Sequence, residues 1–146
     1  MVYEMQCASL PSRNLEMITE LIRSCFFVSS FDKDHLQEYE SAVVAQADKK
    51  YVAVLLLKKL DKDPQPVYKI ECFCVLPSFR GKGLGTEMLS CLKANKNKIF
   101  QLEIDNANLN GKQNYEKLKL FYERNGFVEV PPQKKDAAYT TMQMIT

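Results

Sequence analysis

The sequence predicts a mixed α/β (α+β) fold, in which one central sheet of about six or seven strands is flanked by about four helices. Two observations lead to this class. Segments with helical periodicity alternate with runs of β-branched and aromatic residues, in the order β-α-α-β-β-β-α-β-α-β-β, which is typical of helices packed on both sides of one sheet. The 146 residues, 46% of them hydrophobic, have the size and composition of a single domain, residues 1–146.

The first half of the chain combines one clear amphipathic helix with a strand-rich segment. Apolar residues recur at helical spacing after Pro11-Ser12, a typical helix start, and a polar stretch with an acidic first turn follows. Two Val- and Leu-rich runs around Asp48-Lys49-Lys50 then predict a β-hairpin. The expected elements are, in order, a strand at 2–8, a helix at 12–26, a short helix at 32–40 and strands at 41–47 and 51–60.

The second half alternates strands and helices more regularly. Pro77 ends a run that is β-branched and aromatic enough for a central strand, and Asn125-Gly126 ends the last helix. The expected elements are a strand at 67–76, a helix at 85–97, a strand at 98–104, a polar loop at 105–114, a helix at 115–124 and strands at 127–130 and 138–145.

Charge, apolar runs and cysteine spacing argue against several classes of protein. The net charge is only +2, from 20 Lys and Arg against 18 Asp and Glu, and no aromatic-plus-basic RNA motif is present, so we expect no nucleic-acid partner. No basic segment followed by an apolar run opens the chain and no long apolar run occurs, so we expect no membrane association and a cytoplasmic location. The five cysteines lack zinc-site spacing, so we expect no metal and reduced, buried thiols.

The segment from Val75 to Gly85, V-L-P-S-F-R-G-K-G-L-G, lies between an expected strand and an expected helix. Glycines let the backbone approach a ligand closely, and helix N-terminal amides form an anion site to which Arg80 and Lys82 would add charge-assisted contacts. The spacing G-x-G-x-G differs from the nucleotide-triphosphate loop and from the dinucleotide fingerprint. The spacing alone leaves open a phosphate-bearing ligand of another class or a flexible glycine turn.

Two motifs resemble those of one known family. Arg80-Gly81-Lys82-Gly83-Leu84-Gly85 looks like the R/Q-x-x-G-x-G/A signature of the GCN5-related N-acetyltransferase (GNAT) superfamily. Phe121-Tyr122-Glu123-Arg124-Asn125-Gly126-Phe127 is similar to that family's second motif, fY-x-x-x-G-F, on a helix-to-strand turn. The resemblance covers about 67–130 directly, and it implies a single-domain GNAT fold.

The resemblance also implies acetyl-CoA (coenzyme A) as co-substrate. In this family the pyrophosphate sits on the amides of the glycine loop, and the pantetheine arm slots between two splayed strands, here those at 67–76 and 98–104. Many members carry an asparagine near the pantetheine seven residues before the motif tyrosine, and that position is Tyr115 here. The implied cofactor contacts are Cys74, Val75, Arg80, Gly81, Lys82, Gly83, Leu84, Gly85, Thr86 and Tyr115.

Acetyl transfer to an amine needs a neutral amine, a stabilised oxyanion and a protonated leaving thiolate. Glu71, four residues before Val75, is the first choice for the base that takes the amine proton, directly or through water. Its alternative is a structural ion pair, for example with Lys69. Backbone N–H groups near Val75 would hold the oxyanion. Tyr122 matches the family's general acid, and its alternative is an aromatic core residue.

The family usually builds its acceptor site from the first two helices, the loop between them and the last strands. In this chain that segment mixes carboxylates and aromatic rings, a combination that suits a cationic amine. A solvated acidic helix face is the alternative. The expected substrate contacts are Phe31, Asp32, Asp34 and Glu38.

The expected function is therefore that of an acetyl-CoA-dependent N-acetyltransferase, which moves acetyl directly to a primary amine such as a polyamine or a lysine side chain. One alternative is an aminosugar-phosphate N-acetyltransferase of the glucosamine 6-phosphate type, for which Lys134 and Lys135 are the candidate phosphate contacts. Another is a non-catalytic CoA-binding or protein-interaction module with a GNAT fold. Symmetric dimers are the commonest oligomers of soluble proteins, so a homodimer is the oligomeric state to test first.

Overall fold

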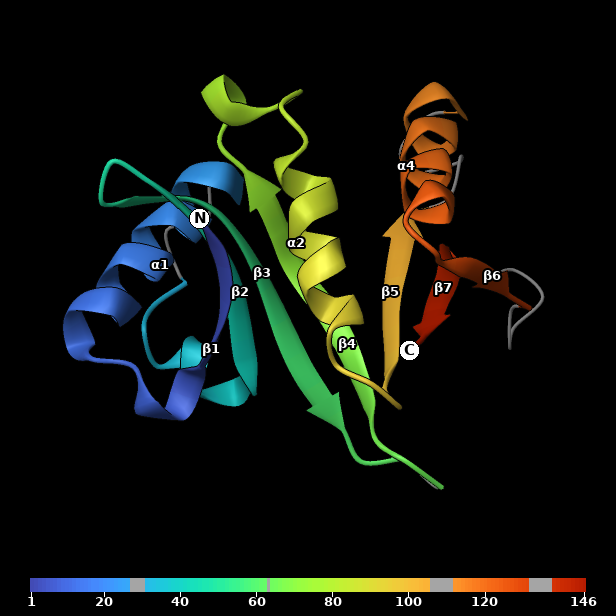
Figure 1. Ribbon diagram of the computed structural model, residues 1–146, viewed down its shortest axis with the longest axis horizontal. Coiled ribbons are helices and arrows are strands. Elements are labelled where there is room, and N and C mark those ends of the chain that lie inside the picture. Colours follow the sequence, from blue (N-terminus) through green and yellow to red (C-terminus); the bar gives the residue numbers. More distant parts are fainter. Residues whose placement is uncertain (27–30, 63, 106–111, 132–137) are drawn as a thin grey trace.

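The computed structural model describes residues 1–26, 31–62, 64–105, 112–131 and 138–146, and these form one seven-stranded sheet with helices around it (Figure 1). The strands are ordered β1-β2-β3-β4-β5-β7-β6, and all neighbours are antiparallel except β4 and β5, which are parallel. The strands are β1 Val2–Gln6, β2 Ser41–Ala47, β3 Lys50–Leu60, β4 Val67–Val75, β5 Ile99–Asp105, β6 Val128–Val130 and β7 Tyr139–Ile145. The predicted fold class and strand number are confirmed.

Within the described ranges there are three α-helices and three 3₁₀ turns. The helices are α1 Ser12–Phe26, α2 Leu84–Lys93 and α4 Lys112–Arg124, and the turns are Cys7–Ser9, His35–Glu38 and Pro77–Phe79. The helix expected at 115–124 begins earlier, at Lys112, and most of the loop expected at 105–114 lies outside the described residues.

The second helix, expected at 32–40, is wrong: only the 3₁₀ turn His35–Glu38 forms there. Leu36 is its one buried residue, so the segment has no apolar stripe to hold a longer helix against the sheet. The carboxylate of Asp32 also accepts the amides of Asp34 and His35, at 2.9 and 3.3 Å. Such local side-chain bonds compete with helix formation, which explains why the segment stays a turn.

Two hydrophobic clusters cover opposite faces of the sheet. One cluster packs Met88, Leu89 and Leu92 of α2 against one face of the sheet, including residues of β5 and β7. Tyr115, Phe121 and Tyr122 of α4 pack at its edge. The other joins Ile18, Leu21 and Ile22 of α1 to β2, β3 and the turn at Leu36. This layering places α1 on one face of β4 and the helices α2 and α4 on the other.

A β-bulge in β4 changes which side chains face which layer. Val54 pairs with Cys74 and Leu56 with Glu71, so Leu55 alone lies opposite both Cys72 and Phe73. Cys72 takes the left-handed conformation, with φ 53°, which is uncommon for a residue with a side chain. Strict alternation would place Phe73 on the same face as Glu71. With the bulge, Phe73 instead packs with the α2–α4 cluster, while Cys72 and Cys74 pack with the α1 cluster.

Candidate active site

The parallel strands β4 and β5 separate along their length, as Figure 1 shows. They pair only through Val67 with Ile99, Tyr68 with Phe100 and Lys69 with Gln101. Beyond Lys69 the backbone of β4 has no strand partner on the β5 side within the described part of the chain. Polar backbone groups along this edge are available to a ligand that lies between the strands.

Val75 stands at the open end of this gap. The amide of the next residue, Leu76, donates to the carbonyl of Val52 on β3 at 2.9 Å. Because successive amides of a strand point to opposite sides, the amide of Val75 points away from β3 and toward the gap. Its carbonyl accepts a hydrogen bond from Arg80 Nε at 2.8 Å, which ties the glycine loop to the end of the strand.

The glycine loop exposes the N-terminus of α2. Gly81 and Gly83 have φ of 75° and 82°, and Gly83 is the N-cap residue of the helix. The first intrahelical bond runs from the amide of Glu87 to the carbonyl of Gly83, at 3.0 Å. The three preceding amides, of Leu84, Gly85 and Thr86, therefore have no partner inside the helix, and amides at such a helix end favour an anionic group.

Replacing Gly83 by alanine is expected to weaken CoA binding about tenfold and to lower the melting temperature by about 5 °C. The added Cβ meets no atom within 4 Å, so the cost is backbone strain, about 1–2 kcal/mol at a positive φ. Relief of that strain turns loop amides away from a bound pyrophosphate, and one lost charge-assisted bond is worth about 1.5 kcal/mol. Calorimetric titration with CoA and a thermal melt would measure the two effects.

Gly126 offers the matched control. It also has a positive φ, 96°, but it lies at the end of α4, where an added Cβ would make only ordinary contacts with Met144 and Lys93. Gly126→Ala should cost stability while leaving the affinity for CoA unchanged. Equal CoA affinities of Gly83→Ala and the wild type would contradict the role of the loop.

The third glycine is required by packing. At Gly85 a Cβ would lie 3.1 Å from the ring of Phe121 on α4, so glycine lets the two helices approach closely. The loop cations differ in their positions: Arg80 borders the cavity described next, whereas the ammonium of Lys82 lies 5.4 Å over the ring of Phe79.

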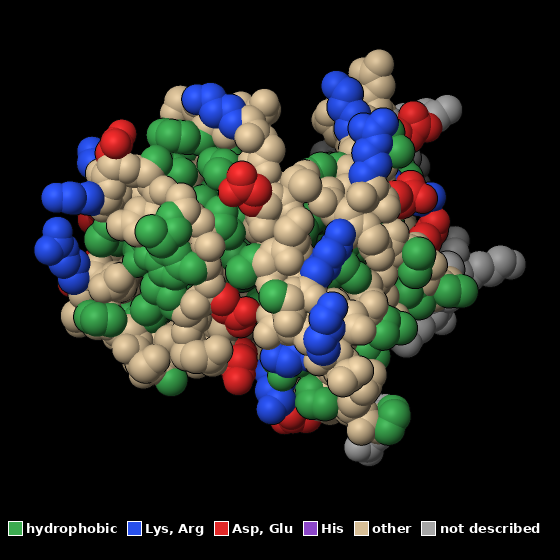
Figure 2. Space-filling view, viewed as in Figure 1, with side chains coloured by type: hydrophobic (Ala, Val, Ile, Leu, Met, Phe, Trp, Pro, Cys, Tyr) green, Lys and Arg blue, Asp and Glu red, His purple; other side chains and the backbone are tan. Residues whose placement is uncertain are grey.

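A cavity of about 670 Å³ opens between the glycine loop, β4 and α4, and Figure 2 shows the surface hollowed between the loop that precedes α2 and helix α4. Most of the predicted cofactor contacts line it. The lining residues are Cys25, Phe26, Phe73, Cys74, Val75, Phe79, Arg80, Gly81, Gly83, Leu84, Gly85, Thr86, Leu118, Phe121 and Tyr122. The aromatic rings of Phe73 on β4 and Phe121 on α4 lie next to the third glycine of the loop, Gly85.

Tyr122 sits among aromatic rings at the boundary of this cavity. Its ring lies 5.2 Å from that of Phe121, 5.7 Å from that of Phe127 and 6.5 Å from that of Phe73. No hydrogen bond of its hydroxyl to another described residue is present. Burial raises the pKa of Tyr122 to about 12, so the hydroxyl stays protonated at neutral and moderately alkaline pH.

A second cavity, of about 500 Å³, lies between the separating strands and shares four residues with the first. The shared residues are Phe26, Phe73, Leu118 and Tyr122. Its other lining residues are Lys69, Ile70, Glu71, Cys72, Leu102, Glu103 and Tyr139. Tyr122 and Glu71, the two residues predicted for proton transfer, therefore line the same cavity.

The carboxylate of Glu71 is held by two neighbours. The hydroxyl of Tyr39 donates to Glu71 Oε2 at 2.8 Å, and Lys69 Nζ lies 3.5 Å from Glu71 Oε1 and 3.6 Å from Glu103 Oε1. Burial and the bond to Glu71 raise the pKa of Tyr39, so this hydroxyl remains a donor. The ion pair with Lys69 that the sequence left as an alternative is present, and the carboxylate still borders the cavity.

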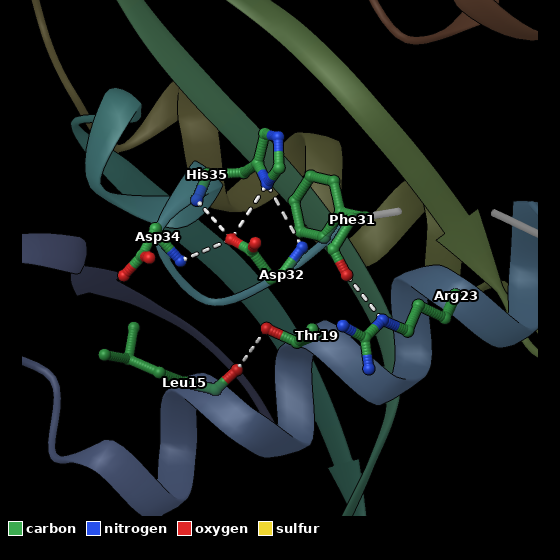
Figure 3. A network of polar contacts seen from close by, with 7 residues as sticks. All are labelled: Leu15, Thr19, Arg23, Phe31, Asp32, Asp34 and His35. Carbon is green, nitrogen blue, oxygen red and sulfur yellow. Dashed lines mark hydrogen bonds and ion pairs between the residues drawn. The ribbon is translucent and has the colours of Figure 1, made fainter. Parts of the chain in front are cut away.

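The predicted acceptor contacts at 31–38 do not border either cavity. Figure 3 shows Asp32 turned toward its own segment, where His35 Nδ1 and the amides of Asp34 and His35 contact its carboxylate. Although desolvation acts to raise it, these hydrogen bonds lower the pKa of Asp32. Phe31 stacks on His35 and its carbonyl accepts a bond from Arg23 on α1. Asp34 and Glu38 are exposed.

Of two further predicted cofactor contacts, Tyr115 borders neither cavity, whereas Cys74 lines the first cavity and is otherwise buried in the core. The hydroxyl of Tyr115 shares a hydrogen bond of 2.8 Å with Thr140 on β7, and the ring packs at the edge of the core. Burial, and then the neighbouring thiol of Cys25, raise the pKa of Cys74, which keeps this thiol protonated and a poor nucleophile.

None of the described helices is long and apolar enough to cross a membrane. No group of three or more His, Cys, Asp or Glu side chains placed to hold a metal ion occurs in the described part of the chain.

Comparisons with known proteins agree with this geometry. A family model described as an acetyltransferase (GNAT) domain matches residues 38–129. The fold is similar to that of Escherichia coli ElaA, with 19% identity, a TM-score of 0.72 and coverage of 99% of this chain and 98% of that one. The fold is also similar to that of an acyl-CoA N-acyltransferase from Pseudomonas aeruginosa. The identity is 19%, the TM-score is 0.73, and the match covers 99% of this chain and 98% of that one.

A third similar structure is Arabidopsis thaliana Naa50 in complex with the bisubstrate analogue CoA-Ac-MVNAL. It has 16% identity and a TM-score of 0.70, and the match covers 99% of each chain. At these identities the three structures show a shared fold. No curated protein sequence gives a significant match.

Proposed function

The chain belongs to the GNAT family of acetyltransferases, and we propose that it transfers acetyl from acetyl-CoA directly to a primary amine, with Glu71 as base and Tyr122 as acid. Acetyl-CoA is the acetyl donor of this family. The family model spans the glycine loop, both separating strands and α4, which contribute most of the residues that line the two cavities.

One observation carries the proposal: Tyr122 borders both the cavity beside the glycine loop and the cavity that contains Glu71. A donor bound at the loop and an acceptor beside Glu71 would meet at this residue. Placing the two reactants side by side is itself a large part of catalysis, because it removes the entropy cost of their encounter.

The proposed reaction uses the groups in sequence. Glu71, oriented by Tyr39 and Lys69, accepts the proton of the ammonium directly or through water. The neutral amine attacks the thioester carbonyl, whose oxygen takes up negative charge that the amide of Val75 would stabilise. The hydroxyl of Tyr122 then donates its proton to the leaving thiolate as the C–S bond breaks. The resulting tyrosinate takes the extra proton of the attacking nitrogen, so that the neutral amide, the CoA thiol and the hydroxyl of Tyr122 are left.

The second cavity, which contains Glu71 and is called the acceptor cavity below, favours a cationic amine such as a polyamine or a lysine side chain. Two carboxylates and one ammonium group border it, so an aminosugar phosphate would place its anion beside Glu71 and Glu103 while Lys69 is already paired with both. Lys134 and Lys135, the candidate phosphate contacts, lie outside the described residues. The presence of Tyr122 and Glu71 at one cavity favours an active enzyme over a binding module.

Thiol release tests the proposal. Purified protein would be incubated with acetyl-CoA and one acceptor at a time. The acceptors are spermidine, Nα-acetyl-lysine amide, a lysine peptide and glucosamine 6-phosphate. We expect amine-dependent release of CoA thiol with one of the cationic acceptors and formation of the acetylated amine by mass spectrometry. CoA binding without release for any acceptor would instead support a non-catalytic module.

A further inference from the structure

The acceptor cavity has a charged floor and an apolar rim. Its charged groups are Lys69, Glu71 and Glu103, which leave one negative charge in excess where the three side chains are only partly exposed. A partly desolvated site with this surplus attracts one cationic head group. The surplus comes from Glu103 on β5, because Lys69 and Glu71 alone would be neutral.

The rim is formed by exposed apolar side chains from three separate elements. Phe26 of α1, Leu118 of α4 and Tyr139 of β7 are 43%, 38% and 49% exposed, and all three line the cavity. They make up three of the seven large hydrophobic residues that the described chain exposes. Exposed apolar side chains gathered around a cavity mark a place where an apolar group is bound.

Floor and rim come from different elements and differ in exposure. The charged groups stand on β4 and β5, with side chains 26% to 35% exposed, whereas the apolar residues, at the ends of α1 and β7 and on α4, are 38% to 49% exposed. An acceptor with its amino group beside Glu71 and Tyr122 therefore extends its remaining atoms across an apolar surface. A second cation or a phosphate on those atoms would have to lose water against Phe26, Leu118 and Tyr139.

We propose that the acceptor is a primary amine with a single cationic head on an apolar aliphatic or aromatic body, held by Glu71 and Glu103 at the head and by Phe26, Leu118 and Tyr139 along the body. This inference rests on the proposed acetyl transfer and narrows its substrate class. The same chemistry is found in free alkyl- and arylalkylamines and in the side chain of a peptide lysine.

A series of amines with one head group and growing bodies tests the inference. Thiol release would be measured with ethanolamine, n-propylamine, n-butylamine, n-hexylamine and phenethylamine, and with spermidine and a lysine peptide at equal concentration. We expect kcat/KM to rise about fourfold for each added methylene that the rim covers, and n-hexylamine and phenethylamine to exceed spermidine. A higher kcat/KM for the lysine peptide than for n-hexylamine would indicate that the acceptor is a lysine side chain of a polypeptide.

Paired variants locate the effect. Leu118→Ala should lower the ratio of n-hexylamine to ethanolamine kcat/KM about tenfold, whereas Leu120→Ala, on the same helix and 47% exposed but bordering neither cavity, should leave the ratio unchanged. Glu103→Gln should raise KM for n-hexylamine, and Glu129→Gln, which removes a carboxylate paired with Lys119 away from the cavity, should not.

Calorimetric titration of the free enzyme with n-hexylamine and ethanolamine separates failure of this inference from failure of the proposed function. Tighter binding of n-hexylamine that Leu118→Ala abolishes would support the inference even if no amine were acetylated. Equal kcat/KM for ethanolamine and n-hexylamine, or a preference for spermidine, would overturn it while leaving acetyl transfer in place. Equal binding of the two amines would overturn it regardless of turnover.

Discussion

The Tyr122→Phe variant is expected to release CoA thiol about 100- to 10,000-fold more slowly than the wild type, the range that removal of a general acid produces. The loss should appear in kcat, because the hydroxyl acts on the leaving thiolate as the C–S bond breaks. Steady-state kinetics with the best acceptor of the amine panel would measure it. The ring contributes its packing with Phe73, Phe121 and Phe127 in both proteins.

The same substitution should leave the fold and the cofactor site intact. Within the described residues the hydroxyl of Tyr122 makes no hydrogen bond to the protein, so its removal leaves no buried partner unsatisfied. The melting temperature and the affinity for CoA should therefore match those of the wild type. An unchanged kcat with unchanged CoA affinity would show that Tyr122 is only a core aromatic residue.

Ionisation of Tyr122 should not limit the alkaline side of the pH profile. Its pKa is raised to about 12 by burial, so the proton is retained from neutral pH to about pH 10. Over the same interval the neutral fraction of an alkyl amine, whose pKa is about 10, rises. The rate of the wild type with subsaturating amine should therefore rise toward about pH 10.

The order of strands along the chain and the glycine loop could be predicted because local patterns determine them. Pro77 and the glycines at 81, 83 and 85 mark a strand-to-helix turn whatever the rest of the chain does, and the left-handed φ at two of them agrees with that interpretation. The sequence also placed Glu71 on the central strand and Tyr122 on the last helix, where the structure has them.

The acceptor side could not be predicted because it depends on tertiary contacts. Sequence alternation gives no sign of the bulge at Cys72, which places Phe73 and Glu71 on opposite faces of β4. The carboxylate of Asp32, expected to bind substrate, is used by the amides of its own turn. Glu103 was missed. The usable signal was the alternation of polar residues on two adjacent strands, Lys69-x-Glu71 and Gln101-x-Glu103, which the pairing of Lys69 with Gln101 brings side by side.

Replacing Glu71 by glutamine is the second substitution with a large expected effect: kcat/KM should fall about 100- to 10,000-fold at pH 7. Glutamine keeps the size of the side chain and an oxygen that can accept the hydroxyl of Tyr39, and Lys69 retains its contact with Glu103. The loss therefore reports the missing carboxylate. Glu4→Gln is the matched control, because that carboxylate is also hydrogen-bonded on a strand, by Ser41 and Asn95, but borders neither cavity.

The pH dependence of the loss separates a base from a structural ion pair. A base is needed only while the amine is protonated, and near pH 10, close to the pKa of about 10 of an alkyl amine, a large share of the acceptor arrives neutral. If Glu71 removes the ammonium proton, the deficit of Glu71→Gln should shrink as the pH rises from about 7 to about 10. If the carboxylate only pairs with Lys69, the deficit should not depend on the protonation state of the acceptor amine and should stay constant over that range. A constant deficit would show that Glu71 only stabilises the structure of the cavity and that water removes the proton.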